Sequence, residues 1–298
     1  MKKDLISIVD VKNDLEKIIN DAIEIKKYGC KRIMEGKVMA MIFEKSSTRT
    51  RVSFDVAVKK LGGHSIFLSK NDIQLGRGET IEDTAKVLSK YADIIAYRAY
   101  SHENMKELAR HASVPVINAL DDAEHPCQVI ADFMTVKEKK GRLKDINFVY
   151  IGDGNNNMAH SYLLGGAIVG MNVKIVSPRK YWPSELYIKK AREIGGKFEI
   201  EELNENSPVN ADIIATDTWI SMGDEHEKEE RIRDFQGYTV NEVFMAKAKK
   251  DAIFLHCLPA YYGYEVTKEV AHGKQSVIFE EAWNRLWAQM AIIKWIFE

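Results

Sequence analysis

The stretch Phe43-Glu44-Lys45-Ser46-Ser47-Thr48-Arg49-Thr50-Arg51 decides the fold. An apolar run, 38–43, precedes it and predicts a buried strand. After it, apolar residues recur with helical spacing, at Val52, Phe54, Val56, Ala57 and Leu61. The polar cluster therefore lies where a strand ends and a helix begins.

This polar cluster suits a phosphate group. A helix start offers backbone N–H groups and the positive end of the helix dipole, and both favour anions. Hydroxyls add donors, and arginine adds a planar fork that matches phosphate oxygens. The alternative is a simple N-cap with solvated arginines, since serine and threonine are ordinary capping residues. We favour the phosphate cradle because a cap needs fewer hydroxyl residues than this stretch carries.

The composition is that of a soluble globular protein. The chain has 298 residues, 45% of them hydrophobic and 29% charged, which suggests about two domains. A net charge of -1 gives no reason to expect nucleic acid or a membrane surface. The first residues lack the apolar core of a signal peptide. The three cysteines, Cys30, Cys127 and Cys257, have no disulfide or zinc spacing, so we expect a cytoplasmic protein.

Strands and helices are expected to alternate along the whole chain. Predicted strands are 38–43, 65–68, 94–97, 114–118, 147–151, 172–176, 198–200, 213–216 and 253–255. Predicted helices are 9–28, 51–61, 81–90, 103–111, 126–139, 158–169, 184–194, a segment near 240–248, and 282–297. The alternation predicts an α/β fold with two doubly wound parallel sheets of similar size.

We expect a domain boundary near residue 140, giving domains 1–140 and 141–298, with helix 126–139 bridging them. In such sheets, ligands bind beyond the carboxyl ends of the strands. Arg98 follows one predicted strand, where the alternative to a site role is a surface salt bridge. His125 opens the bridging helix, where the dipole favours a neutral imidazole that can donate to a carbonyl, and Gln128 lies one turn on. Their alternative is a capping histidine with a structural glutamine.

Three further stretches end strands or fill loops. Residues 152–158, Gly-Asp-Gly-Asn-Asn-Asn-Met, lack the full dinucleotide fingerprint, so a nicotinamide site is rejected. The asparagines suit a small polar ligand or, for Asn155 and Asn156, a turn with an N-cap. Loop 70–79 is polar, and a solvated surface loop is as good an interpretation as a site.

Two more stretches carry reactive side chains. Asp217, in Asp-Thr-Trp-Ile-Ser-Met-Gly, could hold a cation at a strand end. His256-Cys257-Leu258-Pro259 follows another strand. Cys257 could be a nucleophile, although a small buried thiol is the favoured interpretation from these residues alone.

Taken together, these motifs resemble one family. Ser47-Thr48-Arg49-Thr50-Arg51, His125-Pro126-Cys127-Gln128, the segment from Asp217 to Gly223, His256-Cys257-Leu258-Pro259 and Asn284-Arg285 stand in the order seen in ornithine carbamoyltransferases. The resemblance runs from about residue 40 to the end. The first two motifs are shared with aspartate carbamoyltransferases, whereas the Ser-Met-Gly and His-Cys-Leu-Pro segments indicate the ornithine branch.

The resemblance implies a carbamoyl phosphate-binding domain, an ornithine-binding domain, and a last helix, 280–298, that packs back on the first. It also implies a homotrimer, or a multiple of trimers, with shared sites, in arginine metabolism and amino-acid biosynthesis. It implies no cofactor and no metal. The carbamoyl phosphate contacts it implies are Ser47, Thr48, Arg49, Thr50, Gln74, Arg98, His125, Gln128, Cys257, Leu258 and Arg285, and the ornithine contacts are Asn157, Asp217, Ser221 and Met222. Gln74 would serve the neighbouring subunit.

The implied reaction is direct transfer of the carbamoyl group from carbamoyl phosphate to the δ-amine of L-ornithine, with Arg49, Arg98, His125, Cys257 and Arg285 as catalytic residues. Two departures from the family pattern stand out. Tyr261-Tyr262 replace the usual histidine or arginine, and Trp283 replaces a glutamate that would orient Arg285. The alternatives are transfer to another amine, such as putrescine or lysine, and a non-catalytic phosphate-binding regulator.

Overall fold

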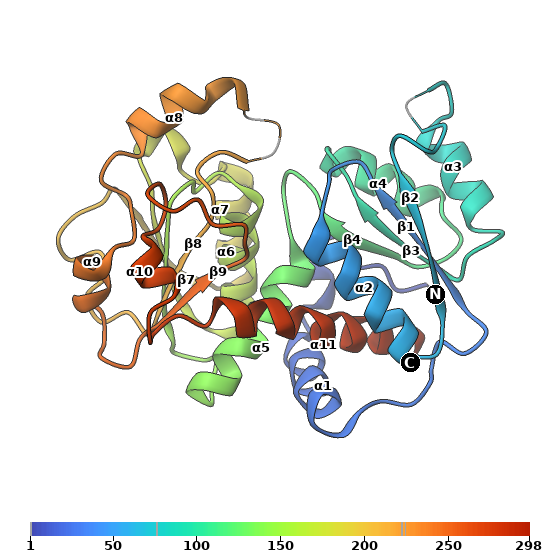
Figure 1. Cartoon of the computed structure of the whole chain (residues 1–298), viewed down its shortest axis with the longest axis horizontal. Coiled ribbons are helices and arrows are strands. Elements are labelled where there is room, and N and C mark those ends of the chain that lie inside the picture. Colours follow the sequence, from blue (N-terminus) through green and yellow to red (C-terminus); the bar gives the residue numbers. More distant parts are fainter. Residues whose placement is uncertain (1, 76, 222, 224) are drawn as a thin grey trace. The chain divides into compact units, whose positions relative to one another are not determined.

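The chain divides into two compact units, each described here by itself. Unit 1 comprises Met1–Met134 and Trp283–Glu298, and unit 2 comprises Thr135–Ala282. A computed structural model describes residues 2–75, 77–221, 223 and 225–298 (Figure 1). Helix α5 (Pro126–Lys140) and helix α11 (Ile278–Phe297) each contribute residues to both units.

Unit 1 is built on a four-stranded sheet in which all neighbouring strands are parallel. Its order is β2-β1-β3-β4, with β1 (Val38–Phe43), β2 (His64–Ser69), β3 (Ile94–Arg98) and β4 (Val116–Leu120). After β1, the next strand in sequence, β2, pairs with one side of β1, and the strand after that, β3, pairs with the other side of β1. The point where the strand order reverses therefore lies between β1 and β3, which is where ligands bind in open α/β sheets.

Helices cover both faces of this sheet. Helices α3 (Ile81–Leu88) and α4 (His102–His111) contribute Ala85, Met105 and Leu108 to a buried core with Ile42, Ile95 and Tyr97. Helix α2 (Thr48–Lys60) lies in front of the sheet and α4 behind it in Figure 1. The first helical segment departs from the prediction. The segment predicted as one helix at 9–28 forms a short 3-10 helix, η1 (Ile8–Val11), and then α1 (Leu15–Tyr28).

Unit 2 contains a five-stranded parallel sheet of order β7-β6-β5-β8-β9. Its strands are β5 (Asn147–Ile151), β6 (Asn172–Val176), β7 (Lys197–Glu201), β8 (Ile213–Thr216) and β9 (Ile253–His256). Tyr162 of α6 (Asn157–Val169) packs on Phe148 and Tyr150 on one face. Phe235, Trp219 and Phe254 belong to the core on the other. Here the strand order reverses between β5 and β8.

The remaining helices of unit 2 are short, apart from α7 (Glu185–Ile194). Helices α8 (Lys228–Asp234) and α10 (Lys268–Ala271) and the 3-10 turns η2 (Arg179–Tyr181) and η3 (Glu225–Glu227) were not predicted, and α9 spans Glu242–Ala246. The last helix begins at Ile278, four residues before the predicted start. The two parallel sheets and the return of Trp283–Glu298 to unit 1 confirm the predicted fold class.

Candidate active site

The phosphate-cradle stretch forms the loop after β1 and the first turn of α2. Ser47 is the N-cap, and its Oγ accepts a hydrogen bond of 3.2 Å from the backbone N–H of Thr50. Ser47 thus performs the capping role that the alternative interpretation gave it. Thr48 and Arg49 start the helix, where the first N–H groups have no carbonyl partner within the helix. The cap and an anion site are therefore compatible.

An open hollow of about 670 Å³ lies against this helix start. Ser47, Thr48 and Arg51 line it together with Lys45 and Lys70. The two ammonium groups lie 4.9 Å and 5.1 Å from the centre of the Tyr100 ring. Sequence analysis did not assign these lysines to the site, although both follow strands. They add positive charge where a phosphate would enter.

A second group of unit 1 side chains is almost fully buried beside the first turn of α2. Arg285 Nη2 of α11 donates to Thr50 Oγ1 at 2.5 Å. Arg98 ends β3, opposite Phe43 in the parallel register, and the backbone N–H of Glu44 donates to the Arg98 carbonyl at 2.9 Å. Arg98, His125 and Arg285 are 5%, 3% and 3% exposed. A guanidinium group is buried to this degree at low cost only where hydrogen bonds or an opposite charge compensate it, and such a group can pair with an anion.

His125 precedes α5 and is buried in an environment that favours the neutral imidazole. Burial lowers its pKa well below the usual value, and the nearby charges of Arg285 and Arg98 lower it further. The direction of this shift agrees with the predicted neutral imidazole, although the prediction gave the helix dipole as the cause. One turn on, Gln128 Nε2 donates to Asp132 Oδ1 at 2.8 Å. Cys127 is a buried thiol whose Sγ donates to the Asn118 carbonyl, and burial raises its pKa to about 12.

Gln74 lies on the loop between β2 and α3 and is exposed. It is not among the residues that line the hollow, whereas its loop neighbours Lys70 and Asn71 are.

Trp283 is 53% exposed, and Lys26 Nζ lies 4.5 Å from the centre of its ring. The same ammonium donates to Asn284 Oδ1 at 2.8 Å. Where relatives would carry a glutamate, this chain therefore has an aromatic contact with α1.

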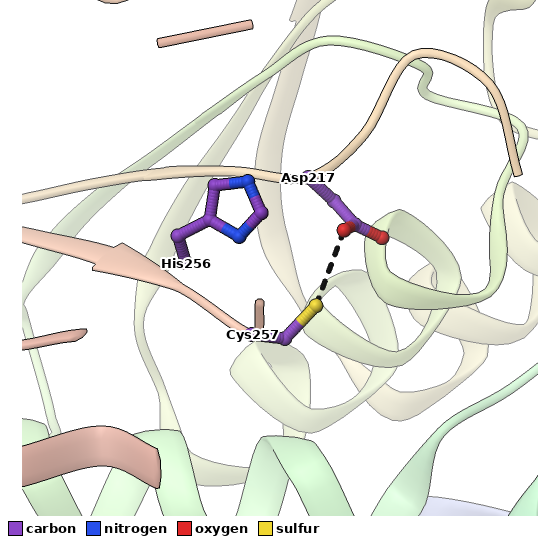
Figure 2. Close-up of side chains that lie close together, drawn as sticks. All are labelled: Asp217, His256 and Cys257. Atoms are coloured by element: carbon purple, nitrogen blue, oxygen red, sulfur yellow. Dashed lines mark hydrogen bonds between the residues drawn. The ribbon is translucent and has the colours of Figure 1, made fainter. Parts of the chain in front are cut away.

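In unit 2, Asp217 and Cys257 follow the adjacent strands β8 and β9, whose last residues Thr216 and His256 are paired in register. Cys257 Sγ donates to Asp217 Oδ1 at 3.1 Å (Figure 2). Burial raises the pKa of Asp217 above its ordinary value. A thiol that donates to a carboxylate is protonated, so this geometry does not present Cys257 as a thiolate nucleophile.

His256 fixes the backbone that carries Cys257 and Leu258. Its Nδ1 accepts from the Leu258 N–H at 2.9 Å, which leaves the proton on Nε2, 3.1 Å from Glu265 Oε1. Leu258 has φ of 60°, a left-handed conformation that a leucine rarely adopts. The histidine therefore holds a strained turn in place.

Asp217, His256 and Cys257 also offer donor atoms that lie within 4.8 Å of one another, close enough to share a metal ion (Figure 2). Both ring nitrogens of His256 already have hydrogen-bond partners in the protein. A metal ion at His256 would have to break one of these bonds. The geometry therefore favours a hydrogen-bonded network.

The loop after β5 brings Asn157 to the start of α6. Asn156 is the N-cap, with its Oδ1 accepting from the Ala159 N–H at 2.8 Å, and Asn155 donates its N–H to Asp153 Oδ1. The turn-and-cap alternative is therefore correct for these two residues. Asn157 and Ser221 are half-buried in unit 2, and Met222 lies outside the described residues.

A buried arginine ties this loop to the one that follows β8. Arg231 Nη1, on α8, lies 2.6 Å from Asp153 Oδ2 and donates to the Trp219 carbonyl at 3.1 Å. Sequence reasoning missed Arg231 because α8 was not predicted. Arg231 holds the two loops that carry Asn157 and Asp217 against each other within unit 2.

Comparison with known families gives the class of protein that this fold and these residues define. Residues 3–138 match the description "Aspartate/ornithine carbamoyltransferase, carbamoyl-P binding domain", and residues 144–296 match "Aspartate/ornithine carbamoyltransferase, Asp/Orn binding domain". The chain belongs to the aspartate/ornithine carbamoyltransferase family.

Individual relatives are similar over nearly their whole length. The chain is 52% identical to an ornithine carbamoyltransferase of Picrophilus torridus, covering 98% of both chains. It is 50% identical to a catabolic ornithine carbamoyltransferase of Thermoplasma volcanium, covering 98% of this chain and 97% of the relative. The crystal structure of an anabolic ornithine carbamoyltransferase from Campylobacter jejuni superposes with a TM-score of 0.94 at 41% identity, covering 99% and 98%.

Proposed function

We propose that this chain transfers the carbamoyl group of carbamoyl phosphate to the δ-amine of L-ornithine, giving L-citrulline and phosphate. The observation that carries the proposal is the buried group of Thr50, Arg98, His125 and Arg285 in unit 1. In this group Arg285 donates to Thr50, and the charges of Arg285 and Arg98 act on the buried imidazole of His125. Relatives that share about half of the sequence are named ornithine carbamoyltransferases.

The phosphate and the carbamoyl group of carbamoyl phosphate are each bound by their own set of protein groups. The phosphate binds to Ser47, Thr48, Arg49 and Thr50 at the start of α2, with Lys45 and Lys70 adding charge at the rim. The carbamoyl group is held by Arg98, His125 and Gln128. Negative charge grows on the carbonyl oxygen as nitrogen attacks, so Thr50, Arg98 and His125 act as oxyanion donors. A neutral His125 suits this role because its ring N–H can donate a hydrogen bond to the carbonyl oxygen and keep its proton.

The amine must attack uncharged. A lysine-like amine has a pKa of about 10.4, so freeing it at pH 7 costs about 4.6 kcal/mol. A carboxylate beside the δ-nitrogen would raise this cost. Asp217 therefore binds the α-ammonium group of ornithine, with Asn157, Ser221 and Met222 completing the grip on the amino acid. Cys257 and Leu258 lie toward the side-chain end.

Transfer is direct. The δ-nitrogen forms a bond to the carbonyl carbon, the carbon–oxygen bond to phosphate breaks, and the proton lost from the nitrogen passes to the departing phosphate. Arg49 and Arg285 stabilise the departing phosphate, and each charged hydrogen bond contributes about 1.5–3 kcal/mol. No acyl-enzyme is needed because carbamoyl phosphate already carries a good leaving group. The protonated thiol of Cys257 agrees with this.

We further propose a homotrimer, or a multiple of trimers, in which Gln74 reaches the neighbouring site. Strand β2 is an edge of its sheet, and Ile66 on it and Val52 on α2 are 50% and 54% exposed. Exposed apolar side chains beside an unpaired strand edge suit a subunit contact. Light scattering of the purified protein measures the mass, and a monomer would contradict this part of the proposal.

The domain roles follow the family descriptions: residues 1–140 bind carbamoyl phosphate, and 141–298 bind ornithine, with 280–298 returning to the first domain. Among the described residues, no helix is both long and apolar enough to span a membrane. We place the enzyme in the cytoplasm, in arginine metabolism and amino-acid biosynthesis. Cys30, Cys127 and Cys257 form no disulfide bond, as is usual for cysteines in a reducing compartment.

A citrulline-formation assay with purified protein tests the function. Ornithine, putrescine, lysine and aspartate are supplied separately with carbamoyl phosphate, and then in competition. We expect carbamoylation of ornithine to dominate. Faster carbamoylation of putrescine or lysine would assign another acceptor, and binding of carbamoyl phosphate without transfer to any amine would indicate a regulator.

A further inference from the structure

The turn that carries His125 is closed by its own side chains. Asp121 Oδ1 accepts from the N–H groups of Ala123 and Glu124, at 2.9 Å and 2.7 Å. Asp121 Oδ2 accepts from Asn118 Nδ2 at 2.8 Å and lies 2.7 Å from His102 Nδ1. The turn is therefore rigid in itself, and what remains to be fixed is its position relative to the rest of unit 1.

Glu124 supplies that attachment. Its carboxylate is completely buried, and Oε2 accepts two hydrogen bonds of 2.9 Å, from Ser7 Oγ and from the backbone N–H of Ile8. Both donors lie at the start of η1, 116 and 117 positions earlier in the chain. The carboxylate thus joins the beginning of unit 1 to the residue immediately before His125. The other oxygen, Oε1, has no hydrogen-bond partner among the described residues.

We propose that Glu124 is a positioning residue that holds His125 in register with the carbamoyl group through its bonds to Ser7 and Ile8. The inference rests on the proposed function and adds a residue that the family pattern does not assign. A fully buried carboxylate is expensive unless donors hold it, so its presence here points to a specific use. A displacement of about 1 Å at a catalytic group can cost about 100-fold in rate.

The charge of this carboxylate changes near neutral pH. Burial raises the pKa of Glu124 to about 7, and the negative charge of Asp121 adds to the rise, while the Ile8 N–H, Ser7 and His102 oppose it. The other acidic group at η1 is Asp10, which is exposed and accepts from the N–H groups of Ile6 and Ser7. Ionised oxygen accepts stronger hydrogen bonds than neutral oxygen. The attachment is therefore tightest above pH 7 and loosens below it.

Three variants test the inference: Glu124→Leu, which removes both bonds, Glu124→Gln, which keeps an acceptor but cannot ionise, and Ser7→Ala, which removes one donor. For Glu124→Leu we expect kcat for citrulline formation to fall by about 10- to 100-fold, with the KM for ornithine within about twofold. Protonation of the substrate amine affects both proteins alike, so the two are compared as a ratio: kcat of the wild type relative to kcat of Glu124→Gln should fall below about pH 7.

Asp14→Ala is the matched control, because it removes a side-chain bond of the same N-terminal segment, from Trp295 Nε1 to Asp14 Oδ2, without touching Ser7, Ile8 or the turn. We expect it to lower Tm and leave kcat unchanged. NMR of the His125 imidazole gives a readout without turnover, in which the resonance should move between pH 6 and 8 in the wild type but not in Glu124→Gln. Folded Ser7→Ala and Glu124→Gln proteins with wild-type kcat, pH profile and imidazole resonance would overturn the inference. Absence of citrulline formation by the wild type would instead contradict the proposed function, and the NMR comparison would still decide the role of Glu124.

Discussion

Arg285 Nη2 donates to Thr50 Oγ1 at 2.5 Å and thereby joins the last helix of the chain to the first turn of α2. The two residues are 235 positions apart. This bond brings a guanidinium group from the end of the sequence to the phosphate cradle near its start.

Replacing Arg285 by methionine should therefore remove a phosphate and oxyanion partner. Loss of one such donor typically lowers kcat by about 100- to 1000-fold. Steady-state citrulline assays measure the loss. Trp283→Phe is the control, because Trp283 is exposed on the same helix and contacts Lys26. Equal losses of kcat in both variants would show that kcat depends on the packing of α11 and not on the guanidinium group of Arg285.

The second prediction concerns Asp217. Asp217→Asn should raise the Kd of ornithine by about 10-fold or more, since a charged hydrogen bond contributes about 1.5–3 kcal/mol. The Kd of carbamoyl phosphate should change little. Isothermal titration calorimetry with each substrate separates the two. An unchanged affinity for ornithine would refute the assignment of Asp217 to the α-ammonium group.

The third prediction is a pH dependence of stability set by His125. Burial depresses its folded-state pKa, so the unfolded chain binds the proton more readily below about pH 6.5. The free energy of unfolding should therefore fall as the pH drops below about 6.5, and His125→Gln should flatten that decline. Urea titrations between pH 5 and 8 measure it. Parallel curves for the variant and the wild type would contradict the neutral, buried imidazole.

The fourth prediction concerns Glu124, the residue before His125. Its effect on the pH dependence of the free energy of unfolding has the opposite sign to that of His125. The pKa of Glu124 in the folded state, about 7, lies above the ordinary value of 4.5. The ionised carboxylate accepts the stronger bonds from Ser7 and Ile8, but burying its charge costs more than these bonds return. The contribution of Glu124 to stability is thus full below about pH 4.5 and is lost as the pH rises through about 7, a difference of about 3 kcal/mol. Glu124→Gln should be more stable relative to the wild type at pH 8 than at pH 5. Thermal melts at both pH values check this, and a constant difference would contradict it.

The sequence predicted the sheets well because each strand is an apolar run bounded by turn residues. Strands β1, β5, β6 and β8 have the predicted bounds. Helix α8 was missed because Lys228–Asp234 is mostly charged and has no apolar periodicity. The start of α11 was missed because Glu280 and Glu281 interrupt the apolar pattern, although acidic residues favour a first helical turn.

The positions of candidate residues were predictable where a motif follows a strand, as at Thr48, Arg98, Asp217 and Cys257. Strand register brings such residues together. Residues that act through distant partners were not predictable. Arg231 gains its role from Asp153, and Glu124 from Ser7. Nothing local to Arg231 or Glu124 in the sequence distinguishes them from solvated surface charges.

The most direct test of the account is a crystal structure with a bisubstrate analogue that joins a phosphonate to ornithine. We predict the phosphonate oxygens about 3 Å from the first N–H groups of α2 and from Arg49, with the carbonyl oxygen at a similar distance from Arg98 and His125. A complex in which Arg49 and Arg98 point away from the inhibitor would contradict the central claim.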